Sequence, residues 1–122
     1  MTKGIGIDIV DIKRMEERIK KKEFINLVFS KEEIIYCQSK KHHAQHFAAR
    51  FAAKEAYMKA LGLGWTSNTE FKDIEIINDQ KGKPEIVLSN QSSTYFKKQG
   101  YKQALVSLSH TSTLATAIVT LE

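Results

Sequence analysis

Two carboxylates in apolar surroundings are the residues of this 122-residue chain best placed to do chemistry. Asp8 lies within the run Gly-Ile-Gly-Ile-Asp-Ile-Val at residues 4–10, and Glu55 lies within an alanine-rich run at residues 47–56. An ionised carboxylate in such surroundings costs free energy unless a charged partner or a metal compensates it. Two oxygen ligands on two elements suit a hard cation such as Mg²⁺, which binds one or two carboxylates together with phosphate oxygens. Lys, Arg and His fall in the same segments, so the pair predicts a phosphate-handling site.

A strand and a helix must position these two side chains. Residues 3–10 predict a buried strand, in which the isoleucines at positions 5, 7 and 9 share one face. Asp8 shares the other face with Gly4, Gly6 and Val10, and the glycines leave room for something to approach. Residues 43–61 predict the longest helix, because they are rich in alanine and are followed by Gly62, a residue typical of helix ends.

The remaining patterns predict helices in the first half of the chain and strands in the second. A helix is expected over residues 11–22, and the capping box at Ser30 and Glu33 predicts another that runs to about residue 39. After Gly62 we expect strands 71–77 and 84–88 around a turn at 79–82, a short helix at 91–99, and a closing antiparallel pair, 104–110 and 114–120. Together they predict an α+β fold, a single domain over residues 1–122 with an antiparallel sheet packed against a long helix.

Basic residues surround Glu55 on the predicted long helix, and they allow structural explanations of the two carboxylates. Glu55 and Lys59 are four residues apart, and an exposed pair at that spacing adds only a few tenths of a kcal/mol. Asp8 could instead form a buried ion pair with Arg50 or Lys54. Either pairing competes with the metal-site interpretation.

The histidines offer a weaker signal. His110 stands in Ser-His-Thr at residues 109–111, at the end of an apolar strand, where functional side chains often lie. His42, His43 and His46 could form a metal cluster with His110. A solvated helix start explains the first three better, and no cysteine pairing supports zinc.

Composition limits the class of protein. The net charge is +5, from 19 basic and 14 acidic residues, and bases crowd residues 13–22. Such a block suggests an acidic partner (nucleic acid, an acidic protein or a phosphorylated ligand) or simply a solvated helix face. The single cysteine, Cys37, cannot form an internal disulfide, which fits a reducing cytoplasm. No stretch approaches the ~18 apolar residues of a membrane span, so we expect no membrane association.

Three motifs together resemble a known family. They are Gly-Ile-Gly-Ile-Asp-Ile-Val-Asp-Ile-Lys-Arg at residues 4–14, Arg-Phe-Ala-Ala-Lys-Glu-Ala-Tyr-Met-Lys-Ala-Leu-Gly at 50–62, and Ser-Leu-Ser-His at 107–110. Their order and spacing resemble the holo-acyl-carrier-protein synthases, the short branch of the 4′-phosphopantetheinyl transferases. The resemblance spans essentially the whole chain, and the first two motifs are its most specific part.

The resemblance implies an activity and a set of partners. Members transfer the 4′-phosphopantetheine arm of coenzyme A to a serine of apo-acyl carrier protein, release adenosine 3′,5′-bisphosphate, and support fatty acid biosynthesis in the cytoplasm. They form trimers with active sites between subunits. Leu105, Val106 and Leu108, apolar on both faces of a strand, would fit such an interface or the core.

The resemblance also implies residue roles. Asp8 and Glu55 would hold Mg²⁺ against the pyrophosphate, and Lys59 would contact phosphate. The coenzyme A site would also include Gly62, Gly64, His110 and Thr111, and the carrier protein would meet Arg14 and Arg18. Leu63 departs from the usual Gly-Thr-Gly, so any contact there must come from backbone. The base for the serine proton is either a water activated by the metal or a carboxylate near Asp8.

Two other functions compete with this enzyme. A nucleic-acid-binding module would use the basic segment 11–22, which has no aromatic residue and only two arginines, and it leaves Asp8 unexplained. A structural or interaction domain would need an Asp8–Lys54 ion pair. The phosphopantetheinyl transferase accounts for both carboxylates and for the basic segment, because carrier proteins are typically acidic.

Overall fold

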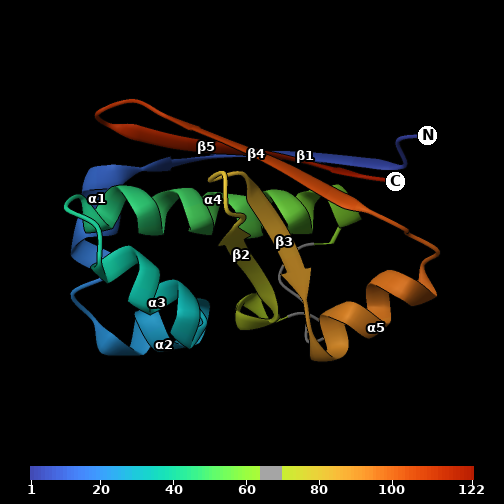
Figure 1. Cartoon of the computed structure of the whole chain (residues 1–122), viewed down its shortest axis with the longest axis horizontal. Helices are drawn as coiled ribbons and strands as arrows, with labels where there is room; N and C mark the ends of the chain where they lie inside the picture. Colours follow the sequence, from blue (N-terminus) through green and yellow to red (C-terminus); the bar gives the residue numbers. More distant parts are fainter. Residues whose placement is uncertain (64–69) are drawn as a thin grey trace.

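The computed structural model of the chain describes residues 1–63 and 70–122. Figure 1 shows a sheet lying across one long helix, with most of the other helices and a hairpin on the helix's far side. In chain order the elements are β1 (Gly4–Asp11), α1 (Ile12–Arg18), α2 (Lys22–Val28), α3 (Lys31–Gln38), α4 (His43–Leu61), the 3₁₀ turn η1 (Phe71–Asp73), β2 (Ile74–Asn78), β3 (Pro84–Leu88), α5 (Asn90–Lys98), β4 (Ala104–His110) and β5 (Leu114–Leu121).

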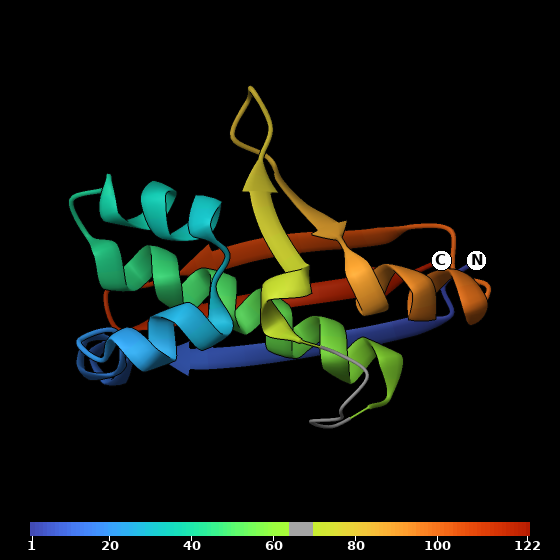
Figure 2. The same ribbon diagram turned by 90° about the horizontal axis from the view of Figure 1, so that it is seen from below.

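The main sheet is antiparallel, with strand order β1-β5-β4, and β2 and β3 form a separate antiparallel hairpin. Alternate residues of β5, from Ala115 to Leu121, are buried against α4, which buries most of its own residues. The hairpin projects away from this body (Figure 2). The architecture confirms the predicted α+β fold, with an antiparallel sheet packed against a long helix.

Two glycines let β1 lie directly on the backbone of α4. A Cβ atom at Gly6 would overlap the carbonyl oxygen of Ala56, and one at Gly4 would overlap that of Ala60. The room expected beside Asp8 is therefore filled, at Gly6 two residues earlier along the strand, by the helix that carries Glu55. Small residues on both elements bring the two carboxylates toward each other.

The far side of α4 is anchored by a buried ion pair. Lys54 is fully buried, and its Nζ donates to Glu33 Oε1, to the Phe71 carbonyl and to the Ile74 carbonyl, each at 2.7 Å. Glu33 also accepts from the backbone N–H groups of Ser30 and Ile76, both at 2.9 Å. The predicted capping box at Ser30 is thus present, and the Asp8–Lys54 pair considered from the sequence is wrong.

Two sequence expectations need correction. The helix expected over 11–22 ends at Arg18, and a separate helix, α2, follows because Phe24 turns back to pack against the rings of Phe29 and Phe51. Residues 71–73, expected to begin a strand, form the 3₁₀ turn η1 instead.

Cys37 in α3 is fully buried, and burial raises the pKa of its thiol to about 12.

Candidate active site

Asp8 and Glu55 line one pocket of about 380 Å³, which we call the first pocket. Asp8 comes from the inner face of β1, at the edge of the sheet, and Glu55 comes from the middle of α4. Lys59, one turn beyond Glu55, donates from Nζ to Asp8 Oδ1 and to the Ile7 carbonyl, both at 3.0 Å. Lys59 therefore pairs with Asp8 across the two elements, and not with Glu55 as the spacing on the helix alone suggested.

The electrostatics of the first pocket favour a cation. Burial raises the pKa of Glu55 above its ordinary value, and the nearby charge of Asp8 raises it further, against the opposing charges of Lys59 and Arg18. The Asp8 side chain is only 16% exposed, whereas that of Lys59 is 56% exposed. The two positive charges near the carboxylates, on Lys59 and Arg18, are both on exposed side chains, and a cation bound between the carboxylates would relieve their repulsion further.

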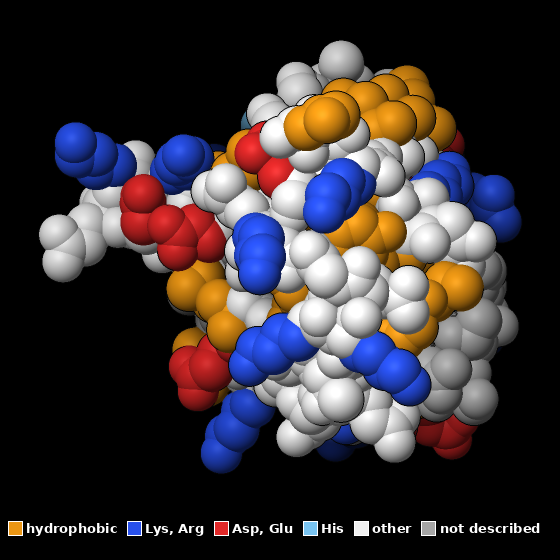
Figure 3. Space-filling view, turned by 90° about the vertical axis from the view of Figure 1, so that its right-hand side faces the viewer, with side chains coloured by type: hydrophobic (Ala, Val, Ile, Leu, Met, Phe, Trp, Pro, Cys, Tyr) orange, Lys and Arg blue, Asp and Glu red, His pale blue; other side chains and the backbone are white. Residues whose placement is uncertain are grey.

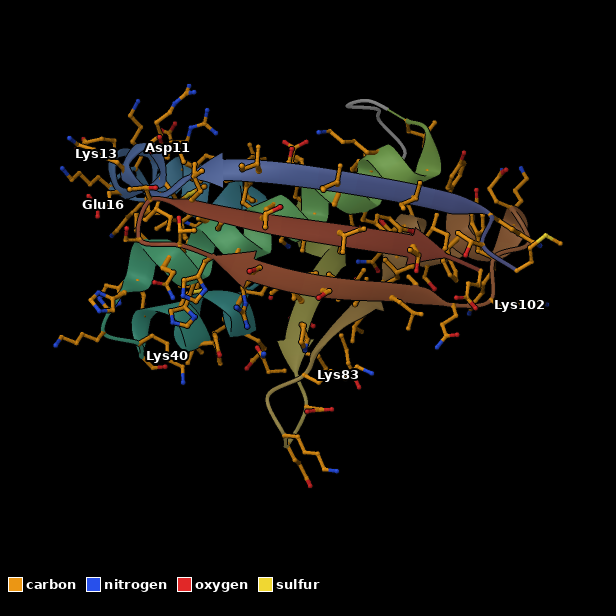
Figure 4. The ribbon with its side chains drawn as sticks, turned by 90° about the horizontal axis from the view of Figure 1, so that it is seen from above. Asp11, Lys13, Glu16, Lys40, Lys83 and Lys102 are labelled. Atoms are coloured by element: carbon orange, nitrogen blue, oxygen red, sulfur yellow. The ribbon has the colours of Figure 1, made fainter. Side chains whose placement is uncertain are left out.

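The rim of the first pocket is basic and aromatic. Arg14 and Arg18 of α1 are exposed and line the pocket, with Phe24 and Phe51 beside them. The Arg18 guanidinium lies 5.8 Å from the Phe24 ring centroid and 5.9 Å from that of Phe51. Cation–π contacts of this kind hold the guanidinium in place while it stays open to a partner. Figure 4 shows Asp11, Lys13 and Glu16 at this same end of β1 and the start of α1.

His110 lies elsewhere, in a second pocket of about 510 Å³. This second pocket is lined by α4, by the β2–β3 hairpin and by β4, whereas the first is lined by β1. Since β1 and β4 are the two edges of the sheet, the pockets belong to opposite edges. Figure 4 shows Lys83 on the hairpin, beyond the β4 edge.

Arg50 also lines the second pocket, a placement that the sequence did not predict. It is 3% exposed, its Nη2 donates to Asn78 Oδ1 at 2.5 Å, and its guanidinium carbon lies 4.0 Å from the Tyr36 ring centroid. Among the described residues, Arg50 has no acidic partner, and no group accepts a hydrogen bond from its Nε. The sequence showed Arg50 only as a possible partner of Asp8, because the hairpin that completes this pocket is about 30 residues away.

The other predicted site residues have mixed placements. Gly62 ends α4 in the left-handed conformation (φ 75°), with open space beside it, as its role at the end of the helix predicted. Thr111 follows His110, and its hydroxyl accepts from the backbone N–H groups of Thr113 and Leu114, so it shapes the β4–β5 turn. Gly64 lies outside the described residues. His42 and His43 line a third cavity, so the four histidines form no single cluster.

No described helix combines the length and the apolar character needed to cross a bilayer.

Comparison with known proteins identifies the family. The family model for the 4′-phosphopantetheinyl transferase superfamily matches residues 4–119. A holo-[acyl-carrier-protein] synthase from Geobacter sp. (strain M21) is 44% identical over 124 residues, covering 100% of this chain and 99% of the relative. One from Cytophaga hutchinsonii is 46% identical over 122 residues, covering 98% of this chain and 96% of the relative.

Solved structures agree with the sequence matches. The holo-[acyl-carrier-protein] synthase from Neisseria meningitidis superposes with a TM-score of 0.93 at 33% identity, covering 100% of this chain and 99% of that one. The Helicobacter pylori enzyme, solved in complex with coenzyme A, gives 0.84 at 36% identity, covering 97% and 99%. Together, the motifs, the fold and these matches show that the chain belongs to the 4′-phosphopantetheinyl transferase superfamily, in its holo-[acyl-carrier-protein] synthase branch.

Proposed function

We propose that this chain transfers the 4′-phosphopantetheine group of coenzyme A to a serine of an apo-acyl carrier protein, at a site centred on Asp8 and Glu55. The serine hydroxyl gives its proton to a base, which is either a water or a carboxylate near Asp8, and its oxygen forms a bond to the phosphorus that carries the pantetheine arm. The bond from that phosphorus to the bridging oxygen breaks, and adenosine 3′,5′-bisphosphate leaves. The observation that carries the proposal is the meeting of Asp8 and Glu55 in the first pocket of a family member, with Lys59 bonded to Asp8.

The residues of the first pocket fit Mg²⁺. Asp8 and Glu55 would hold it, because carboxylate oxygens are the ligands that Mg²⁺ takes from proteins, and the remaining positions are left to water and phosphate oxygens. Burial first, and then the charge of Asp8, raise the pKa of Glu55, and a divalent cation between the two carboxylates would offset both effects. When bound, Mg²⁺ would supply positive charge to the pyrophosphate oxygens.

The chain's own groups then position and neutralise the reactants. Lys59 is half-exposed and sits against Asp8, so its ammonium group can reach a phosphate oxygen at the pocket while it keeps Asp8 in place. Displacement at phosphorus depends on such positioning and on charge stabilisation more than on covalent help from the protein. Arg14 and Arg18 at the rim would meet the acidic carrier protein and bring its serine to the pocket.

We further propose that the active enzyme is a trimer. The outer face of the sheet exposes an apolar patch that consists of Ile5, Ile7 and Ile9, each 62% exposed, with Leu105 and Ile118 beside them. Figure 3, a view of the end where both termini lie, shows hydrophobic side chains gathered along the sheet side of the molecule. Val106 and Leu108 instead pack against the core. Isolated proteins seldom leave a patch of this kind uncovered, and subunits would cover it.

A trimer would also join the two pockets. Because they lie at opposite edges of the sheet, a ring of copies can place the β4 edge of one subunit beside the β1 edge of the next. The first pocket would then hold the pyrophosphate, and the second pocket of the neighbour, with Arg50 and His110, would hold the rest of the nucleotide. On this proposal the protein acts in the cytoplasm, and its two substrates, coenzyme A and the carrier protein, serve fatty acid biosynthesis.

Two experiments test these proposals. Saturating coenzyme A with Mg²⁺ should raise the melting temperature by several degrees, because a ligand at 100 times its Kd adds about 2.7 kcal/mol to stability. Glu55→Gln should lose most of the Mg²⁺-dependent part of that shift. No shift in the wild-type protein would contradict the proposed site.

Mixed assemblies of two variants test whether the active site is shared between subunits. Asp8→Asn and His110→Ala should each lower turnover when assembled alone. Co-expressed subunits carrying one change each should regain up to about a quarter of the wild-type sites, because random mixing pairs an intact first pocket with an intact second pocket at that frequency. Mixed assemblies no more active than the average of the two variants would contradict a site shared between subunits.

A further inference from the structure

The second pocket collects basic side chains and no carboxylate. Its basic residues are His46, Arg50, Lys83 and His110, which come from α4, from the hairpin and from β4. Among the described residues that line it, there is no Asp or Glu. The buried guanidinium of Arg50, whose Nε has no hydrogen-bond partner in the part of the chain that the structure describes, gives the pocket a fixed positive charge in surroundings that strengthen electrostatic attraction. A pocket lined by these basic groups favours the binding of an anion.

His46 is a member of this pocket that can change its charge near neutral pH. It lies four residues before Arg50 on α4, on the same side of the helix, and it is half-buried. Its ring meets the edge of the Tyr36 ring at 5.8 Å between centroids. Among the described residues, neither ring nitrogen has a hydrogen-bond partner, so both are available to a ligand.

The surroundings of His46 favour the neutral form of its imidazole. Burial lowers its pKa below the ordinary 6.5, and the positive charges of Arg50, Lys40, His110 and His42 lower it further. The groups that face the pocket from its other elements are Tyr36 of α3, Asn78 and Lys83 of the hairpin, and His110 of β4. None of these contributes a negative charge near neutral pH that would favour the imidazolium form. An anion bound among them would favour it, and would raise the pKa of His46.

We propose that His46 is a specificity-determining residue that takes up a proton when the 3′-phosphate of coenzyme A binds in the second pocket. This rests on the proposed function, which assigns the pyrophosphate to the first pocket and leaves the 3′-phosphate as the ligand's other anion. A phosphate monoester carries about −1.5 to −2 charges at pH 7 and offers three acceptor oxygens. An imidazolium beside Arg50 supplies both the charge and the N–H donor that such a group requires.

The proton uptake is measurable by calorimetry. Binding of coenzyme A, and of dephospho-coenzyme A, which lacks the 3′-phosphate, would be measured at pH 7 with Mg²⁺ in two buffers of different ionisation enthalpy. A rise of one unit in the pKa of His46 on binding gives an uptake of up to about half a proton. The same rise makes binding up to about tenfold tighter at pH values below both pKa values.

The variant His46→Phe, which keeps an aromatic ring beside Tyr36, should lose this part of the uptake and of the affinity for coenzyme A. It should bind dephospho-coenzyme A as the wild-type protein does. His43→Phe is the matched control, since it removes another histidine of the same helix that lines a different cavity. This control should keep the wild-type uptake.

Equal proton uptake by His46→Phe and the wild-type protein would overturn the inference. So would an equal effect of His46→Phe on the two nucleotides, because the 3′-phosphate would then not be the group that His46 meets. Wild-type protein that binds neither nucleotide would overturn the proposed function itself. If coenzyme A binds but the proton uptake does not depend on His46, only the inference about His46 is overturned.

Discussion

Lys54 and Lys59 lie five residues apart on α4, and the structure predicts opposite consequences of changing them. Lys54→Met removes the ammonium group that pairs with Glu33 inside the protein, where both side chains are fully buried. The Glu33 carboxylate would keep its two backbone donors but would lose Lys54, its one ion-pair partner among the described residues. Breaking a buried pair by removing one partner costs about 3–5 kcal/mol of unfolding free energy.

Lys59→Met is the matched control. The Lys59 side chain is 56% exposed, and loss of a pair at such a position costs roughly 0–1 kcal/mol. Urea unfolding of both variants, at one fixed protein concentration because the proposed subunit association would contribute to stability, measures the difference. Lys54→Met should lose a large fraction of a total stability that is typically 5–15 kcal/mol. The effect on activity should be reversed: among folded molecules, Lys59→Met should lower the transfer activity more than Lys54→Met.

A double variant separates the ion pair from simple packing. Replacing both partners, as Lys54→Met with Glu33→Gln, should cost less than the sum of the two single changes, because no charge is left buried alone. The reasoning is refuted if Lys54→Met and Lys59→Met cost the same within about 0.5 kcal/mol, which is the usual limit of additivity.

Three further outcomes follow from single side chains. Gly6→Ala should lower the free energy of unfolding measured in urea by at least the roughly 1–3 kcal/mol typical of overpacking, because its methyl group would overlap the Ala56 carbonyl of α4. The raised pKa of Glu55 means that its carboxyl group binds a proton more tightly in the folded protein, so Mg²⁺ must displace that proton as pH falls. Mg²⁺ affinity should therefore weaken as pH falls through the folded pKa, and Asp8→Asn should lower that pKa in an NMR titration of the Glu55 carboxyl carbon. Tyr57→Phe should leave the melting temperature unchanged or raise it, because the buried Tyr57 hydroxyl has no hydrogen-bond partner among the described residues.

Local sequence signals were sufficient for the two elements that carry Asp8 and Glu55. Alternation of isoleucine with small residues indicated β1, and alanine content with a terminal glycine indicated α4 over its observed length. The capping box at Ser30 was also visible, because its two bonds join residues three apart. Each of these signals depends on neighbours in the chain, so tertiary packing had little to change.

Signals that depend on distant residues were missed. Lys54 stands among alanines and gives no local hint of Glu33, 21 residues earlier, so its burial could not be inferred from periodicity. The break between α1 and α2 comes from Phe24 packing on Phe51, a contact made by folding. The second pocket needs α4, the hairpin and β4 together, and therefore its basic character and the role of Arg50 emerged only from the structure.

The central claim is that Asp8 and Glu55 serve transfer of phosphopantetheine to a carrier protein. Intact-mass spectrometry of an apo-acyl carrier protein, incubated with coenzyme A, Mg²⁺ and this protein, tests it directly. The account predicts that the carrier protein gains one phosphopantetheine group with wild-type protein, and that Asp8→Asn and Glu55→Gln, still folded by circular dichroism, form the adduct far more slowly. A carrier protein of unchanged mass with the wild-type enzyme, or adduct formation at the wild-type rate with both variants, would contradict it.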